Sequence, residues 1–272
     1  MEPAAAMSPE PYSTFYLFFT GLSAGITGAL VPIPARGLGR RFFVLCTVLA
    51  LVFTAAAIVK EGLALSHWHL AGSALLIAYN VTLPKEGGRV SRGLLGLAAL
   101  ASLSGVWLDG QSFLPLLEGF DRGPFSFLPG TASVSSALTV GTALVAMTLG
   151  HFYLVVPGLS FAPLIHGVHA LLVSLVLRAL LWGVALIAQR DSLNSLWQRL
   201  GPEGFALSHG FFLALHLLFG IVGAAVLAWM SLVCAKEKSN QSATGILYVA
   251  VAFTLIGEII ARHMLVTARL LL

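Results

Sequence analysis

The stretch from residue 163 to residue 188 reads PLIHGVHALLVSLVLRALLWGVALIA, and its polar side chains are two histidines, one serine and one arginine. The hydrocarbon core of a bilayer is about 30 Å thick, so an α-helix crosses it with ~20 mostly apolar residues. This stretch is long enough to cross and too apolar for the surface of a soluble protein. The sequence therefore predicts a transmembrane helix here, with Arg178 inside it.

The composition of the whole chain agrees with this prediction. Of its 272 residues, 58% are hydrophobic and 10% are charged, whereas soluble domains carry about 25% charged residues. The two cysteines, Cys46 and Cys234, are too few for a disulfide scaffold. These figures exclude a soluble domain, a disordered chain and a disulfide-rich domain. They predict an all-α, polytopic transmembrane helix bundle.

Further apolar stretches recur along the chain, with prolines and charged residues between them. About eight can span, namely residues 13–34, 43–59, 66–84, 93–108, 132–156, 163–188, 205–233 and 243–269. The fourth is the weakest because it is short and rich in glycine and serine, and seven spans remain if it only enters the interface. We expect one transmembrane domain over residues 1–272, with an extramembrane loop or interfacial cap at residues 109–131.

Basic residues are unevenly divided between the two ends of the predicted helices. One end carries eight, namely Arg36, Arg40, Arg41, Lys85, Arg89, Arg92, Lys236 and Lys238. The other end carries five, namely Lys60, Arg122, Arg190, Arg199 and Arg269. Cytoplasmic loops hold the excess of Lys and Arg, so both termini are expected in the periplasm and the protein in a bacterial inner membrane. No single face collects the basic residues, so nucleic-acid binding is not expected.

Three charged residues remain inside the predicted helices: Arg178, Glu258 and Arg262. A charge at membrane depth costs at least ~2.5 kcal/mol on insertion and is a functional hypothesis by default. Glu258 and Arg262 are four residues apart, so they share a helix face and can pair. A purely structural ion pair is the alternative. We take these three residues and His216 as candidate catalytic residues, and we expect them to line one polar cavity in the outer half of the bundle.

Eight histidines are the second anomaly in so apolar a chain. Facing imidazoles can serve as axial haem ligands. The candidate cofactor ligands are His151, His166, His169 and His209. We expect His151 to lie near His166 or His169, across the short connection 157–162. For His209 and His216, plain helix packing is the alternative. His67 and His69 are assigned to the interface as solvated or capping residues. No Cys-x-x-Cys-His motif occurs, which excludes covalently attached haem, and no metal site is assigned.

The last predicted helix contains Gly257-Glu258-Ile259-Ile260-Ala261-Arg262, followed by an apolar run to residue 272. Together with eight helices, this motif resembles the quinol-interacting membrane anchors of molybdopterin oxidoreductases, of the dimethyl-sulfoxide-reductase and polysulfide-reductase (NrfD-like) type. The resemblance implies a subunit without a soluble catalytic domain. It also implies that electrons pass from membrane quinol to an iron–sulfur partner.

Three classes of function fit these residues. The first is a quinone- and/or haem-interacting subunit of a respiratory electron-transfer complex, with quinone and haem b as candidate cofactors and with membrane or periplasmic partner subunits. Histidine and glutamate supply protonatable groups, and arginine can hold the negative charge of a reduced quinone. The second is a small-molecule or proton-coupled transporter, and the third is a non-catalytic membrane assembly protein. The sequence favours the first and leaves open whether the chain is an enzyme.

Overall fold

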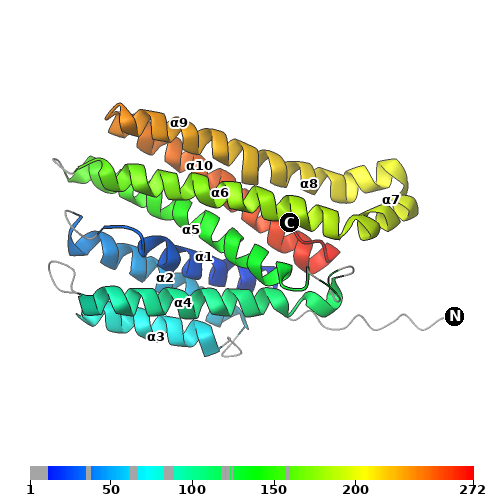
Figure 1. The fold of residues 1–272 in the computed structure, drawn as a ribbon, viewed down its shortest axis with the longest axis horizontal. Coiled ribbons are helices and arrows are strands. Elements are labelled where there is room, and N and C mark those ends of the chain that lie inside the picture. The colour runs from blue at the N-terminus through cyan, green and yellow to red at the C-terminus, as the bar shows by residue number, and fades with distance from the viewer. Residues whose placement is uncertain are drawn as a thin grey trace.

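The structure is a computed structural model, and it describes residues 12–272 except for 35–37, 62–66, 83–88, 118–119, 121–122, 124 and 157–159. Helices dominate the described residues, which contain no strand. The helices run roughly side by side as one elongated bundle (Figure 1). The predicted all-α fold is confirmed.

Each predicted span corresponds to a helix or to part of one. In chain order the first helices are α1 (Thr14–Leu30), α2 (Gly39–Glu61), α3 (His67–Thr82), α4 (Arg89–Gln111), the short 3₁₀ turn η1 (Leu114–Leu116), α5 (Leu128–Val155) and α6 (Ala162–Ala188). The later ones are α7 (Arg190–Phe205), η2 (Ala206–Gly210), α8 (Phe211–Leu215), η3 (His216–Gly223), α9 (Ala224–Lys236), α10 (Asn240–His263) and η4 (Met264–Ala268). The segments from α7 to α9 follow one another without a connecting loop.

Among the described residues, six helical segments are long and apolar enough to cross a bilayer. They are Gly39–Val59, Val90–Leu116, Leu128–Val155, Ala162–Ala188, Arg190–Lys236 and Asn240–Ala268. The fourth predicted span belongs to this set, because α4 extends beyond both ends of the apolar stretch at 93–108. Helix α1 is also apolar but has only 17 residues, and α3 has 16.

Helix α5 lies in the middle of the bundle (Figure 1), where α1, α4, α6 and α10 all pack against it. Helix α3 packs on α4 at one edge, and α9 packs on α10 and α6 at the other. The crossing of α1 and α5 is a backbone contact, because a Cβ atom on Gly25 would lie 1.9 Å from the carbonyl oxygen of Ala137. Small residues permit such close approach in membranes, and it brings α1 against the polar face of α5.

Helix α7 is a difference from the sequence prediction, which placed a connection between two spans here. Gly201, with φ 70°, separates its first three turns from Pro202, which begins the long segment that follows. Proline is well tolerated in a first helical turn. Leu193 and Leu196 pack against the buried cluster that contains Leu270 and Leu272, so α7 covers one end of the bundle (Figure 1). Its mixed polar and apolar residues gave no transmembrane signal.

The segment between α4 and α5 is partly described. Helix α4 runs to Gln111, and α5 begins at Leu128. Phe113, Leu117 and Phe120 are buried in one cluster with Tyr16 and Leu17 of α1. This part of the predicted loop or cap therefore packs its aromatic side chains against the end of α1.

Candidate functional site

Glu258 and Arg262 form a buried ion pair within α10. Arg262 Nε donates to Glu258 Oε1 at 2.6 Å, and both side chains are 4% exposed. Their spacing of four residues places them on one helix face, which is the geometry expected from the sequence. Burial in a membrane bundle makes an unpaired charge very costly, so each residue requires the other.

Two serines of α5 complete the surroundings of this pair. Arg262 Nη1 donates to Ser133 Oγ at 3.0 Å, and Nη2 donates to the Ser133 carbonyl oxygen at 3.2 Å. Ser136 Oγ donates to Glu258 Oε2. Gly21 of α1 lies against the same pair, since a Cβ atom there would be 3.7 Å from Arg262 Nη2. Helices α1, α5 and α10 therefore enclose the pair.

Arg178 reaches the same region from α6. Its Nη1 donates to the carbonyl oxygen of Ala132 at 2.9 Å, and its Nη2 donates to the carbonyl oxygen of Leu272 at 2.5 Å. The side chain is 3% exposed. Both acceptors are main-chain oxygens, whereas Arg262 has the carboxylate of Glu258 as its partner. Arg178 therefore joins the cluster through main-chain oxygens and not through Glu258.

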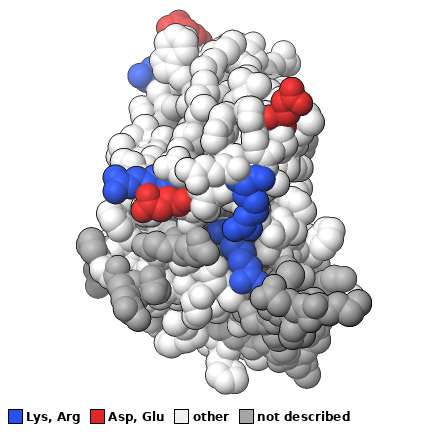
Figure 2. Space-filling view, turned by 90° about the vertical axis from the view of Figure 1, so that its right-hand side faces the viewer, with Lys and Arg blue, Asp and Glu red and all other residues white. Residues whose placement is uncertain are grey.

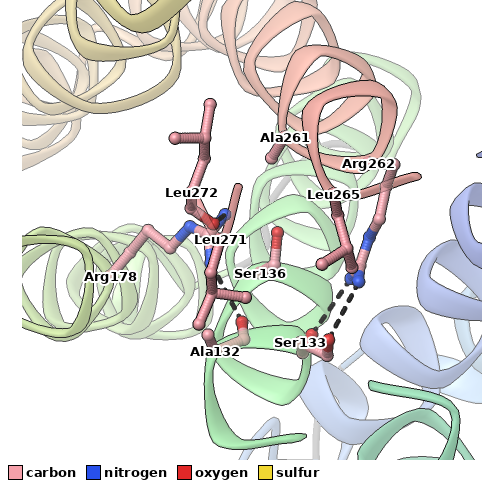
Figure 3. A pocket seen from close by; sticks show the side chains of 9 residues that line it. All are labelled: Ala132, Ser133, Ser136, Arg178, Ala261, Arg262, Leu265, Leu271 and Leu272. Atoms are coloured by element: carbon pink, nitrogen blue, oxygen red, sulfur yellow. Dashed lines mark hydrogen bonds between the residues drawn. The ribbon is translucent and has the colours of Figure 1, made fainter. Parts of the chain in front are cut away.

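A small cavity lies between the two arginines. Its volume is about 10 Å³, and it is lined by Ala132, Ser133, Ser136, Arg178, Ala261, Arg262, Leu265, Leu271 and Leu272. Figure 3 shows Arg178 and Arg262 entering from opposite sides, with Leu271 and Leu272 between them. A space of this size holds about one water molecule. Glu258 borders the cavity through its partners Arg262 and Ser136.

The cavity is closed on one side by the C-terminal segment, which turns back into the bundle after η4. Arg269 has φ 55°, and Leu270 N then donates to the Met264 carbonyl oxygen at 3.1 Å. Gln189 fastens Leu271 through two hydrogen bonds, because its Nε2 donates to the Leu271 carbonyl oxygen at 2.9 Å and its Oε1 accepts from Leu271 N at 3.1 Å. The segment is thus held by side chains on and directly after α6.

His216 occupies a separate buried position beside this cluster. Its Nδ1 lies 3.0 Å from the carbonyl oxygen of Gly257, so Nδ1 carries the proton and donates. Its Nε2 is buried and has no hydrogen-bond partner within the described part of the chain. The Trp182 ring lies 6.1 Å away, centroid to centroid. His216 also begins the π-helical segment η3, a type of irregularity found often at functional sites.

Three of the four candidate cofactor ligands have described contacts, and none of these contacts joins two of the histidines. His151 Nδ1 lies 2.9 Å from the Tyr248 hydroxyl, and His166 Nδ1 lies 2.7 Å from the carbonyl oxygen of Ala162 in its own helix. His209 stacks on Phe205 and lies beside Ser208. His151, His166 and His169 are exposed. Among the described residues, no group of three His, Cys, Asp or Glu side chains is placed to hold a metal ion.

The sequence analysis missed a second buried polar pair, between α3 and α4. His69 Nε2 lies 2.8 Å from Asp109 Oδ2, and the two side chains are 3% and 2% exposed. Gly105 makes room for the imidazole ring, since a Cβ atom there would lie 2.8 Å from His69 Cε1. The sequence prediction places Asp109 in a loop and His69 at the interface. The predicted fourth span ends at residue 108, whereas α4 continues to Gln111. A longer predicted helix would have placed Asp109 on a helix, four residues after Gly105.

An apolar groove of about 360 Å³ lies on the surface of α4, α5 and α6. Its lining residues are Trp107, Phe127, Thr131, Val134, Ser135, Leu138, Leu177 and Leu181. The Ser135 hydroxyl is buried and has no hydrogen-bond partner among the described residues. Ser135 precedes Ser136, the partner of Glu258, so the groove and the charged cluster share α5 and α6.

Comparison of the chain with protein-family models, with curated proteins and with solved structures finds no match. The fold and the site therefore carry the assignment by themselves. Six apolar helical segments and a buried charged cluster enclosed by the bundle define a multi-pass integral membrane protein.

Proposed function

We propose that this protein is a quinone-interacting subunit of an electron-transfer complex in the bacterial inner membrane. The observation that supports this most directly is the buried cluster of Glu258, Arg262 and Arg178 around a water-sized cavity. Burial of an ionisable group within a membrane bundle costs free energy, and such groups commonly mark functional sites. The resemblance of the Gly257–Arg262 motif to quinol-interacting anchors supports the same function.

The chemistry of quinol oxidation suits these residues. A quinol that becomes a quinone releases two protons and two electrons. In the proposal, both electrons pass to an iron–sulfur partner subunit, Glu258 accepts one proton from a quinol hydroxyl, and the second proton passes to water. Glutamate is a suitable base because its surroundings can tune its proton affinity. Arg178 donates hydrogen bonds to the head-group oxygen and stabilises negative charge that develops there.

The ligand requires more space than the cavity provides. A volume of about 10 Å³ holds a water molecule and no aromatic ring. The head-group oxygen would therefore replace the carbonyl oxygen of Leu272 on Arg178, and the segment that holds Leu271 and Leu272 would move aside. The apolar groove on α5 and α6 offers a surface for the isoprenoid chain. Haem b is left out of the proposal because none of the contacts described for the candidate histidines joins two of them.

The test is the substitution Glu258→Gln, assayed in membranes with a soluble quinol analogue. We expect quinol oxidation per molecule of membrane-inserted protein to fall by at least a factor of ~100, the lower range of general-base catalysis, with a partial loss of abundance because the buried pair is broken. Glu237→Gln, at an exposed carboxylate after α9, is the matched control and should keep full activity. Full activity of Glu258→Gln at normal abundance would refute the proposed role. Loss of the protein from the membrane would support a structural ion pair instead.

The proposed topology places both termini in the periplasm, with residues 35–42, 85–92 and 234–242 in the cytoplasm. The eight-to-five division of basic residues supports this orientation. Alkaline phosphatase fused after Leu272 should be active, and the same enzyme fused at Lys238 should be inactive. The reverse pattern would exclude the orientation.

Transport of a small anion is the second candidate function. The observation that favours it is that two buried guanidinium groups, those of Arg178 and Arg262, line one small cavity. Uptake of a radiolabelled anion by proteoliposomes that contain the purified protein would support transport. Quinol oxidation that depends on Glu258, without uptake, would support the first candidate.

A further inference from the structure

A second cavity lies at the end of the bundle that α7 covers, outside the charged cluster of α5, α6 and α10. Its volume is about 270 Å³, and it is lined by Leu116, Ser192, Ser195, Leu196, Arg199, Ala268, Arg269 and Leu270. Figure 2 shows the corresponding end of the molecule, where basic groups gather near the middle with an acidic group beside them. The cavity therefore combines two guanidinium groups and two hydroxyls with leucine side chains.

Helix α7 places this cavity at the level of the membrane surface. Leu193 and Leu196 pack against the buried cluster that contains Leu270 and Leu272, and Trp197 of the same helix is 49% exposed. Tryptophan is enriched at the boundary between lipid chains and water. Helices that combine leucine, tryptophan and basic residues lie in this boundary, so the cavity opens at the depth of lipid head groups.

Arg269 is held toward the cavity by an unusual backbone conformation. Its φ of 55° belongs to the left-handed region, which residues other than glycine rarely adopt. Leu270 N closes this turn on the carbonyl oxygen of Met264. Such strained positions gather at ligand-binding sites. Glycine adopts a positive φ without steric cost, whereas the residue at this turn is an arginine.

We infer that this cavity binds the phosphate group of an anionic phospholipid, with Arg199 and Arg269 as the cationic partners. Arginine suits phosphate because its planar guanidinium group can donate two parallel hydrogen bonds. Ser195 lies at the same wall, with its hydroxyl donating to the Ser192 carbonyl oxygen at 2.8 Å. Leu116, Leu196 and Leu270 give the glycerol backbone and the first methylene groups of the acyl chains an apolar surface. Among the described lining residues there is no carboxylate to repel the phosphate.

The test uses the full chain, purified in a neutral detergent, with phosphatidylglycerol and phosphatidylcholine as the probes. Native mass spectrometry reports binding, and the thermal unfolding midpoint reports stabilisation. Wild-type protein should bind phosphatidylglycerol and be stabilised by it, with little effect of phosphatidylcholine. The variant Arg199→Gln/Arg269→Gly should bind phosphatidylglycerol about tenfold more weakly or worse. Glycine at position 269 removes the charge and suits the positive φ.

Arg190→Gln is the matched control, because Arg190 lies on the same helix, is 74% exposed and is absent from the cavity lining. It should bind phosphatidylglycerol as the wild type does. The variant Arg199→Lys/Arg269→Lys should keep much of the binding. Arg199→Gln alone, at an exposed side chain, carries the test if the double variant does not fold.

Three outcomes would overturn the inference. Equal binding of phosphatidylcholine would show that the phosphate charge does not matter. Unchanged phosphatidylglycerol binding in Arg199→Gln/Arg269→Gly would place the lipid elsewhere. Equal stabilisation by inorganic phosphate alone would show a site for small anions that requires no lipid.

Discussion

Arg178 donates from Nη2 to the carbonyl oxygen of Leu272 at 2.5 Å, across 94 residues of sequence. The side chain of Gln189 binds the neighbouring Leu271 twice: Nε2 donates to the Leu271 carbonyl oxygen, and Oε1 accepts from Leu271 N. The C-terminal segment is therefore bound in the manner of a ligand, by buried polar side chains. A main-chain oxygen occupies the position on Arg178 that the proposed quinone oxygen would take.

The variant Gln189→Leu should loosen this segment. It removes two hydrogen bonds that each contribute ~1 kcal/mol, so local opening should become about 10- to 30-fold more frequent. Amide hydrogen exchange of residues 270–272, followed by mass spectrometry, measures this change. Gln198→Leu, at an exposed side chain of α7, is the control and should leave the exchange unaltered. Equal protection in Gln189→Leu and wild type would show that leucine packing alone fixes the segment.

The Glu258–Arg262 pair should show strong coupling in a double-mutant cycle. Arg262→Gln leaves a buried carboxylate without its cation, and breaking a buried pair costs ~3–5 kcal/mol. Glu258→Gln/Arg262→Gln removes both charges and should be less destabilised than Arg262→Gln alone. Thermal unfolding in detergent measures each corner of the cycle.

The exposed pair Arg190–Asp191, at 3.6 Å and with side chains 74% and 89% exposed, is the control for this cycle. Asp191→Asn should change stability by less than ~1 kcal/mol. Additive losses at Glu258 and Arg262 would contradict the coupling.

The helices could be predicted because crossing a bilayer requires a length and an apolarity that are visible in the sequence. Helix α7 could not be predicted in this way. It is short and polar, and its position depends on Leu193 and Leu196 finding partners on other elements. Arg178, Glu258 and Arg262 could be identified from the sequence because they are charged residues inside apolar stretches, outside every predicted loop.

The partners of these charges were outside the reach of sequence reasoning. Serine is common in membrane helices, so only the rotation of α5 reveals that Ser133 and Ser136 face α10. The acceptor at Leu272 is a main-chain oxygen, which any residue type offers. The His69–Asp109 pair joins two helices. The spacing of residues within either helix therefore does not reveal the pair.

Asp109 should control the titration of Tyr12, which precedes α1. Burial raises the pKa of Tyr12 above its usual 10.0, and the charge of Asp109 and a hydrogen bond to its side chain raise it further. Because the folded protein holds this proton more tightly than the unfolded chain, the stabilisation is present below about pH 10 and is lost as the pH rises through the folded pKa. Asp109→Asn should lower the pKa of Tyr12 but leave it above 10.0, since burial remains.

Phenolate absorbance measures this shift, as the difference between titrations with and without the substitution Tyr12→Phe. Glu203→Gln, at an exposed carboxylate, should leave the difference curve in place. A Tyr12 titration that does not move in Asp109→Asn would mean that the charge of Asp109 does not act on the phenol.

The contact between Gly257 and Gly220 should be intolerant of even one methyl group. A Cβ atom on Gly257 would lie 2.3 Å from the Cα atom of Gly220, so Gly257→Ala must push α10 away from η3. We expect a loss of ~1–3 kcal/mol from overpacking. The movement would also strain the hydrogen bond from His216 Nδ1 to the Gly257 carbonyl oxygen, which is 3.0 Å long, and would displace the adjacent Glu258. Quinol oxidation should therefore fall together with the unfolding temperature.

Gly245→Ala is the matched control on the same helix, because a Cβ atom there meets no other atom within 4 Å. It should be neutral or stabilising by up to ~1 kcal/mol, the difference in helix propensity between alanine and glycine. Thermal unfolding monitored by tryptophan fluorescence compares the two variants in one detergent. If Gly257→Ala unfolds at the same temperature as Gly245→Ala, the two backbones are not in contact. The position of Glu258 would then not depend on this glycine pair.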